Sequence, residues 1–371
     1  MFDFEGIPYP VIFANYQCNS WVPADVKSTL VPAWMKEYAA VDENAVFVPI
    51  AVLASGSHIG IRCGGKLLVY DRNGQFRFLE PISEAAPVVF GREAMAFVQP
   101  SLKLIYQDYA RVAKGAGRTI PGLEQWAYSL LLKPEPKEIV AAIQFTGGPL
   151  RKPKRFSACA LVLRNGARRW FFDIDGSVDH LLVTHDGRKM VLVCQGKVEL
   201  RNIQDGSIIS TFETGVDACP AASLDKNDNL LLMADSMTND LRTRALKAFD
   251  LSGKALWMYS GLGLHVDQPP PCGGEGLVYL VNGQSLECIS KGTCLWSYPL
   301  KSADKSWVTI AKDGSSVVLN GPWLSVVNPQ GERLAEKLVS TDAEETFDAP
   351  PVIDSNGRIL VASGQRLYCF R

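Results

Sequence analysis

Short apolar runs separated by polar turns recur along most of the chain. One unit shows the pattern clearly, with apolar runs at 181–184, 189–194, 197–202 and 208–212. Runs of four to six residues rich in Val, Ile and Leu, joined by tight turns, are typical of β-strands connected as hairpins. Helical spacing of apolar residues is weak, and only Pro32 to Ala40 is expected to form a short helix, opened by a proline in its first turn. The pattern therefore predicts an all-β fold.

The turns repeat with a period near forty residues. The glycines that close them are separated by 40, 47, 39 and 39 residues: Gly166, Gly206, Gly253, Gly292 and Gly331. Gly74 precedes the first of these by 92 residues, about two periods. Four residues after several of these glycines stands an aromatic side chain: Phe78, Trp170, Trp257 and Trp296. Four-stranded antiparallel units repeated about every 40 residues describe a β-propeller, whereas a pair of β-sandwiches would not need this regular register.

One unit carries a specific motif. Residues 248–257 read Ala-Phe-Asp-Leu-Ser-Gly-Lys-Ala-Leu-Trp, which resembles the Ala-x-Asp-x-x-x-Gly-Lys-x-x-Trp core of the quinoprotein-type (PQQ-like) propeller repeat. Residues 71–78, and Gly292 with Trp296, look like degenerate copies, and 188–212 is also similar to WD40-type blades. The resemblance covers the chain from about Ala45 onward. The sequence also resembles, more distantly, the outer-membrane assembly propeller lipoprotein. The resemblance to the quinoprotein-type repeat implies that Phe78, Trp170, Trp257 and Trp296 are structural inter-blade aromatics.

The units sum to eight four-stranded blades, or seven if the weakly marked stretch 84–116 is not a blade. The last unit, 341–371, offers only three strands, and an open ring would leave an unpaired apolar edge. The strand-like run Tyr9 to Gln17 belongs to no blade, so we predict that it closes the last one as an edge strand. The expected organisation is a closing strand and a short helical linker in 1–44, followed by a single β-propeller domain in 45–371.

Composition narrows the classes of function. The 38 Lys and Arg residues balance 39 Asp and Glu, which argues against a surface that binds nucleic acid or anionic membrane globally. The N-terminus lacks the basic and apolar regions of a signal peptide. Nine scattered cysteines fit reduced thiols, although Cys288 and Cys294 flank a tight turn and could also form a cross-strand disulfide. The expected location is cytoplasmic, without membrane association, or periplasmic if Met1 replaced a signal peptide.

Few residues form a pattern that would support catalysis. The chain has no G-x-S-x-G elbow and no P-loop, and its four histidines are His58, His180, His185 and His265. His180 and His185 are five residues apart, but the second belongs to a turn, so no metal site is predicted. The dehydrogenases among the quinoprotein relatives use a quinone, a calcium ion and often a disulfide between adjacent cysteines, and no adjacent pair occurs here. We therefore predict no catalytic residue, no cofactor and no enzyme activity.

A cluster of basic residues is the candidate binding site. Between Leu150 and Trp170 there are seven basic residues and no acid, and four of them share a loop with two prolines: Arg151, Lys152, Lys154 and Arg155. Such a loop suits an anionic partner, or it simply keeps a sheet edge soluble. It lies in one of three irregular insertions (146–157, 236–244 and 111–123) that fall in links on one face of the propeller.

Loops on a rigid scaffold often carry function. The sequence thus predicts a non-catalytic protein-binding scaffold that docks a partner protein on this loop-rich face. Two alternatives stay open: an enzyme acting in the central channel of a quinoprotein-like propeller, and a binder of an anionic ligand or nucleic acid through the 151–155 loop.

Overall fold

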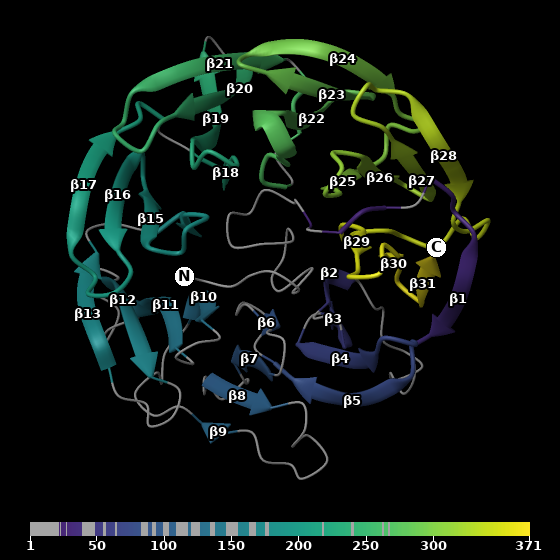
Figure 1. Ribbon diagram of the computed structural model, residues 1–371, viewed down its shortest axis with the longest axis horizontal. Helices are drawn as coiled ribbons and strands as arrows, with labels where there is room; N and C mark the ends of the chain where they lie inside the picture. Colours follow the sequence, from purple (N-terminus) through teal and green to yellow (C-terminus); the bar gives the residue numbers. More distant parts are fainter. Residues whose placement is uncertain are drawn as a thin grey trace.

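The computed structural model describes residues 22, 24–26, 28–38, 49–54, 57–63, 65–82, 88–90, 94–98, 104–108, 118–119, 127–133, 138–145, 155–162, 168–174, 178–216, 219–238, 241–261, 263–265 and 268–371. The strands among them form separate antiparallel sheets arranged as a ring, each sheet running from an inner strand near the centre to an outer strand at the rim (Figure 1). Seven of these sheets contain four strands and one contains three. The protein is therefore an all-β propeller, as the repeat predicted.

The sheets follow one another along the chain. The first two contain β2 (Pro49–Ala54), β3 (His58–Cys63), β4 (Lys66–Asp71) and β5 (Phe76–Pro81), then β6 (Val88–Phe90), β7 (Ala94–Val98), β8 (Leu104–Asp108) and β9 (Arg118–Thr119). The next two contain β10 (Ala127–Lys133), β11 (Glu138–Phe145), β12 (Arg155–Val162) and β13 (Arg168–Ile174), then β14 (His180–Val183), β15 (Lys189–Cys194), β16 (Lys197–Asn202) and β17 (Ile208–Glu213).

The second half of the ring is built in the same way. It contains β18 (Ala221–Leu224), β19 (Leu230–Thr238), β20 (Leu241–Phe249) and β21 (Ala255–Gly261), then β22 (Val278–Asn282), β23 (Ser285–Ser290) and β24 (Thr293–Pro299), then β25 (Ser306–Ile310), β26 (Ser316–Asn320), β27 (Trp323–Val327) and β28 (Arg333–Leu338). The last sheet joins β29 (Val352–Ile353), β30 (Ile359–Ala362) and β31 (Arg366–Phe370) to β1 (Pro32–Glu37) from the N-terminal region. The stretch 84–116, weakly marked in the sequence, thus contains strands of its own sheet.

Burial falls from the middle strands to the rim within each sheet. In the sheet β14–β17, nearly every residue of β15 and β16 is buried, whereas β17 alternates between exposed and half-buried positions. β15 is an almost continuous apolar run because both of its faces are covered. β16 alternates apolar residues with Glu199 and Arg201, whose buried side chains pair with each other at 2.7 Å. The outer strand has one covered face, so its apolar and polar residues alternate.

The turns between third and fourth strands depend on an Asp or Asn side chain. The Asp250 carboxylate accepts hydrogen bonds from the backbone N–H groups of Ser252 and Lys254, at 2.9 and 3.0 Å. Gly253 follows with φ +91°, and a Cβ there would lie 2.6 Å from the Phe212 ring of the preceding sheet. Glycine is therefore required both by the backbone conformation and by the close approach of a neighbouring sheet.

The ring is closed by β1 and not by the segment that the sequence favoured. β1 pairs antiparallel with β31 and occupies the outer position of the last sheet, while Tyr9 to Gln17 lies outside the described residues (Figure 1). The prediction of a helix at Pro32 to Ala40 was wrong, because residues 32–37 are extended. Trp34, Lys36 and Tyr38 are half-buried while their neighbours are exposed, a period of two that fits an edge strand. Pro32 is tolerated as its first residue.

A short segment before β1 fastens it to the neighbouring sheet. The Val22 N–H donates to the Ile310 carbonyl at 2.8 Å, and the Lys312 N–H donates to the Ala24 carbonyl at 2.9 Å. Val22 is fully buried within the largest apolar cluster. The N-terminal region thus runs from β25, an inner strand, to the rim at β1.

The stretch 236–244 is not the irregular insertion predicted from its polar sequence. β19 and β20 have nine residues each, and their pairing continues to Thr238 opposite Leu241. The polar residues instead extend the hairpin between β19 and β20, on the face where the second and third strands of each sheet are connected. Asp235 lies within β19 beside Arg244. Among the described residues there is no helix with the length and apolar character required to cross a membrane.

Candidate functional site

The predicted basic site lies largely outside the described residues. Arg151, Lys152 and Lys154 belong to the undescribed link between β11 and β12, and Arg155 is the first residue of β12. The pairing of β11 with β12 reaches Phe145 opposite Arg155, so the link emerges at that end of the hairpin. The role assigned to these four side chains stays a prediction.

The predicted inter-blade aromatics lie on outer strands, and three of them contact the next sheet. Trp170 lies against Gly206 and donates its indole N–H to the Ile203 carbonyl at 3.1 Å. Trp296 lies against Gly331 and donates in the same way to the Pro329 carbonyl at 2.8 Å. Each tryptophan therefore caps the turn between the third and fourth strands of the following sheet.

The other two members follow the same geometry where it is described. Trp257 lies against Gly292 of the next sheet, and Phe78 packs, half-buried, against the largest apolar cluster. These contacts bury aromatic surface between sheets, and backbone carbonyls accept from the indole N–H groups of Trp170 and Trp296. Their position suits structural packing.

Two further aromatics occupy equivalent places that the sequence reading missed. Phe212 on β17 lies over Gly253, and Trp34 on the closing strand lies over Gly74, where a Cβ would come within 2.9 Å of the indole ring. A signal for Trp34 exists in the spacing, because it precedes its glycine by 40 residues, close to the 36 residues between Trp170 and Gly206. The closing strand therefore supplies the same kind of inter-sheet contact as the regular repeats.

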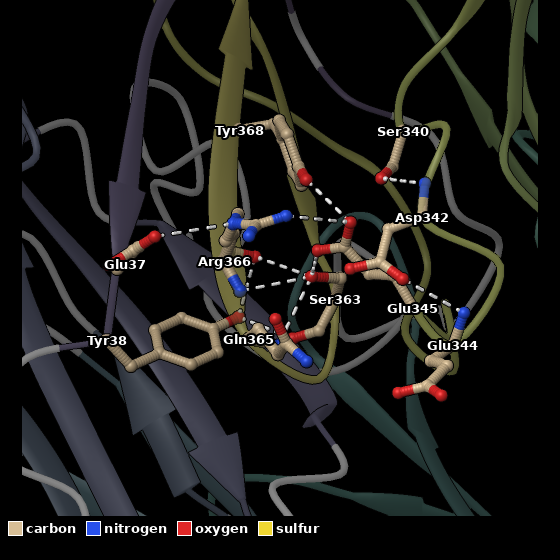
Figure 2. Close-up of polar contacts among 10 residues, drawn as sticks. All are labelled: Glu37, Tyr38, Ser340, Asp342, Glu344, Glu345, Ser363, Gln365, Arg366 and Tyr368. Atoms are coloured by element: carbon tan, nitrogen blue, oxygen red, sulfur yellow. Dashed lines mark hydrogen bonds and ion pairs between the residues drawn. The ribbon is translucent and has the colours of Figure 1, made fainter.

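A cluster of polar side chains lies at the closing seam between β1 and β31 (Figure 2). At its centre is the buried carboxylate of Glu345, which accepts hydrogen bonds from the Ser363 hydroxyl and from the Tyr368 hydroxyl, the latter at 2.7 Å. The Arg366 guanidinium lies 3.5 Å from the same carboxylate and 3.7 Å from Glu37 on β1. The buried negative charge is thus both hydrogen-bonded and paired, as burial requires.

Tyr38 fixes the other end of the seam. Its hydroxyl lies 2.8 Å from the Ser363 carbonyl and 3.0 Å from the Arg366 carbonyl, and its backbone N–H donates to the Gln365 carbonyl (Figure 2). Burial, with smaller contributions from Cys63, Tyr70 and Glu345, raises the pKa of the Tyr38 phenol well above its usual value. Since the hydroxyl stays protonated and directed at backbone carbonyls, this cluster suits holding the strand in place.

The other titratable groups have separate partners. The His180 ring contacts the Cys219 carbonyl at 2.9 Å, and the His185 ring lies 2.7 Å from the Asp228 carboxylate, so the two histidines do not share a ligand. The cysteines whose side chains the structure describes are free thiols: Cys63, Cys194, Cys219, Cys272, Cys288, Cys294 and Cys369. Burial raises the pKa of several of these thiols to about 12, at Cys194, Cys219, Cys288 and Cys369. Within the described ranges no three His, Cys, Asp or Glu side chains gather as a metal site would require.

Exposed apolar side chains mark the outer strands. Ten large apolar side chains of the described residues are exposed, and all except Val31 lie on outer strands: Met35, Phe76, Phe171, Ile208, Ile209, Leu256, Met258, Leu295 and Leu334. On four successive sheets, β17, β21, β24 and β28, the exposed residue occupies the same position, an extra residue inserted in the outer strand as a β-bulge. These four bulged residues are Ile209, Leu256, Leu295 and Leu334.

We call this part of the surface the apolar rim, defined by Ile208, Ile209, Leu256, Met258, Leu295 and Leu334. The bulge explains why the side chains face outward, because the inserted residue has no partner opposite it and bends the strand. On β5 and β13 the same bulged position is occupied by Arg77 and Arg169. A large apolar side chain at the bulged position is therefore a property of these four sheets and not of every outer strand.

The fold is that of known propellers. The chain has a TM-score of 0.56 with the crystal structure of BamB from Moraxella catarrhalis, at 12% sequence identity over 92% of this chain and 100% of that one. It has a TM-score of 0.62 with a quinohemoprotein alcohol dehydrogenase from Pseudomonas putida HK5, at 10% identity over 99% of this chain and 80% of the other. With the Dos1 propeller the TM-score is 0.64, at 10% identity over 93% and 96% of the two chains.

These structural neighbours include members of the quinoprotein-type class that the motif at 248–257 resembles. Neither the protein-family models nor the curated proteins contain a match to the sequence. At 10–12% identity the structural likeness shows the fold, a β-propeller, and the function has to be argued from the chain's own residues.

Proposed function

We propose that the protein is a non-catalytic scaffold that binds another protein. The observation that carries the proposal is the apolar rim, in which six large apolar side chains between 40% and 58% exposed lie on the outer strands of four successive sheets. Soluble proteins rarely expose apolar side chains in a continuous series unless that surface contacts another molecule.

The scaffold itself supports this reading. Along the rim, Trp170, Phe212 and Trp296 each place a ring against a turn glycine of the following sheet, which makes this part of the surface rigid, so little ordering is required when a partner binds. BamB, one of the structural neighbours, is a propeller of the same class. The loop-rich face predicted from the sequence is a second surface that the same partner could contact.

The test is direct binding to a purified partner. Tagged protein would be used to capture proteins from a native lysate, the captured protein would be identified by mass spectrometry, and its binding would be measured with purified components. We expect saturable one-to-one binding that weakens when Leu256 and Leu295 are both changed to Asp. Absence of any saturable protein partner would contradict the proposal, and quinone absorbance in the purified protein would favour the enzyme alternative.

A further inference from the structure

The outer strands of a propeller are sheet edges, and most of them here carry residues that prevent another strand from pairing. Charged residues and prolines are the usual means of blocking such an edge. Among the eight outer strands that are described, seven contain at least one of these residues: β1, β5, β9, β13, β17, β24 and β28. β21 alone, with the sequence Ala-Leu-Trp-Met-Tyr-Ser-Gly, contains neither a charge nor a proline.

β21 is also held rigidly by one face while its other face is bare. Trp257 and Tyr259 pack against the apolar cluster formed between their own sheet and the next, and the Tyr259 hydroxyl donates to the Glu287 carboxylate at 2.6 Å. Met258, between them in the sequence, is 58% exposed, the highest value among the exposed large apolar side chains of the described residues. The bulge at Leu256 distorts the beginning of the strand, so the regular part of the edge runs from Trp257 to Gly261.

The charges on the bare face of this edge are basic, whereas the Glu287 carboxylate lies on its packed face. Lys247 lies directly opposite Met258 on β20, so the two side chains share the bare face. Lys254, which is exposed, immediately precedes β21. Neither β20 nor β21 contains an acidic residue, and the nearby Asp250 carboxylate is occupied by the Ser252 hydroxyl and by backbone N–H groups of its own turn.

We propose that the edge of β21 binds an extended segment of a partner protein by strand addition. The segment would pair its backbone with Trp257–Gly261, place apolar side chains beside Met258 and Leu256, and present acidic residues to Lys247 and Lys254. Backbone hydrogen bonds give affinity in this mode of recognition, and the alternating side chains give specificity. This inference rests on the proposed function, because it names the surface and the class of partner that the scaffold takes.

A second copy of the chain fits this edge less well. Two convex rims that meet at a single strand bury little surface outside that strand, whereas a stable protein interface buries roughly 1,200–2,000 Å² in total. Pairing of β21 with its own copy would also bring the lysines of both copies together. A separate extended segment avoids both difficulties because it can follow the edge and supply the opposite charge.

The test uses two labelled synthetic peptides and the full chain. One heptapeptide reads Glu-Val-Thr-Val-Thr-Val-Glu, and the matched one replaces both Glu residues by Lys. Fluorescence anisotropy is expected to show at least about tenfold tighter binding of the acidic peptide. Met258→Lys, which puts a charge at the centre of the edge, is expected to weaken that binding at least about tenfold, and Ser260→Lys, at another exposed position of β21, is expected to do the same.

The matched control is Leu334→Lys, at an exposed position of β28, a strand that already carries charges. This variant is expected to bind the acidic peptide as the unchanged protein does. Hydrogen exchange is expected to show new protection in 257–261 when the acidic peptide is bound. Absence of binding, equal loss in Leu334→Lys, or a dimer of the free protein that Met258→Lys dissolves would each overturn the proposal.

The two proposals fail in different ways. If a purified partner still binds the Met258→Lys variant with full affinity, strand addition at β21 is excluded while the scaffold function stands. If the acidic peptide binds in the expected manner but the chain has no protein partner, the edge site stands and the scaffold function is excluded.

Discussion

The closing strand β1 and the strand β21 both lie at the outer edge of a sheet, but they are held in opposite ways. β1 carries a proline, a lysine and a glutamate, and polar contacts of Glu37 and Tyr38 fasten it to the hairpin that ends in β31. β21 carries no charge, and its bare face presents Met258 and Leu256 to solvent. The first edge is blocked and fastened, whereas the second is open and apolar.

The difference follows from how each strand reaches its sheet. β21 is joined to β20 by a turn of five residues, whereas β1 pairs with a strand more than three hundred residues away. Bringing distant segments together costs more chain entropy, about 4 kcal/mol more for this difference in loop length. β1 therefore needs contacts beyond its backbone ladder, and the seam around Glu345 supplies them. β21 follows its partner strand directly, and its packing contacts lie on one face only, which leaves its outward side chains free for binding.

The largest expected effect is removal of the closing strand. Deletion of residues 1–38 removes β1 and the segment at Val22, and it exposes the whole edge of β31. Each lost hydrogen bond is worth about 1 kcal/mol, in a domain whose total stability is typically about 5–15 kcal/mol. We expect the truncated chain to aggregate or to lose its cooperative thermal transition.

Deletion of residues 1–17 is the matched control for this experiment, because it retains every described contact of the seam. We expect it to melt well above the longer truncation. Equal melting temperatures for the two truncations would show that β1 contributes nothing to closure, and the comparison with β21 would then lose its basis.

The next effect concerns the aromatics on the two strands. Trp34→Ala removes a ring that lies against Gly74 of the next sheet, and Trp257→Ala removes a ring that packs against the apolar cluster shared by its own sheet and the next. About 3 kcal/mol of unfolding free energy should be lost in each case. Urea unfolding monitored by circular dichroism measures both. If β1 is a full member of the ring, the two losses agree within about 1 kcal/mol. A negligible loss for Trp34→Ala would mean that closure depends on the polar seam alone.

Much of this architecture could be predicted because its sequence signals are local. The Asp-x-x-Gly turns and the tryptophan after them depend on neighbouring residues, so their period located the units. The closing strand could not be found in the same way, because its pairing with β31 is distant in the sequence. Trp34 and Tyr38, four residues apart, fit a helical spacing as well as an alternating one, and only the unpaired edge of β31 decides between them.

The candidate binding edge of β21 was harder to predict from the sequence. In the run Ala-Leu-Trp-Met-Tyr, apolar residues occupy both faces of the strand, so the pattern alone does not tell that Trp257 is packed and Met258 exposed. Which face is covered depends on the neighbouring sheet. One signal was available, because a comparison of the fourth strand of each repeat shows that only this one lacks charges and prolines among the described outer strands.

A smaller effect is expected at the Tyr38 hydroxyl. Tyr38→Phe removes a donor to the Ser363 and Arg366 carbonyls and should cost about 1–2 kcal/mol at neutral pH. Because burial raises the pKa of Tyr38 in the folded state, the unfolded chain loses this proton first as pH rises above about 10. The contribution of Tyr38 to stability is therefore present below that pH and is lost above it.

Unfolding free energies of both proteins at pH 8 and near pH 11 test this prediction. The other tyrosines titrate in both, so the difference between the two proteins isolates Tyr38. We expect that difference to shrink at the higher pH, by at most about 1.4 kcal/mol per pH unit. A difference that stays constant would show that the hydroxyl is not buried at the seam. The bare face of β21 carries no tyrosine hydroxyl. Peptide binding at β21 is therefore the control for a general loss of structure at high pH.

The smallest effect on the fold is expected from the basic loop, and it decides whether the loop-rich face or the rim carries the partner. Changing Arg151, Lys152, Lys154 and Arg155 to Glu should alter stability by less than about 0.5 kcal/mol for each residue. If an acidic partner contacts this loop, its binding should fall by several kcal/mol, because like charges then face each other across the interface. Raising the salt concentration should weaken binding to the unchanged protein in the same direction.

Loss of partner binding in this variant but not in Met258→Lys would assign the interface to the loop-rich face, while the reverse result would assign it to the edge of β21. Hydrogen exchange on the bound complex then gives an independent answer, since protection near 146–157 and protection at 257–261 lie on different parts of the propeller.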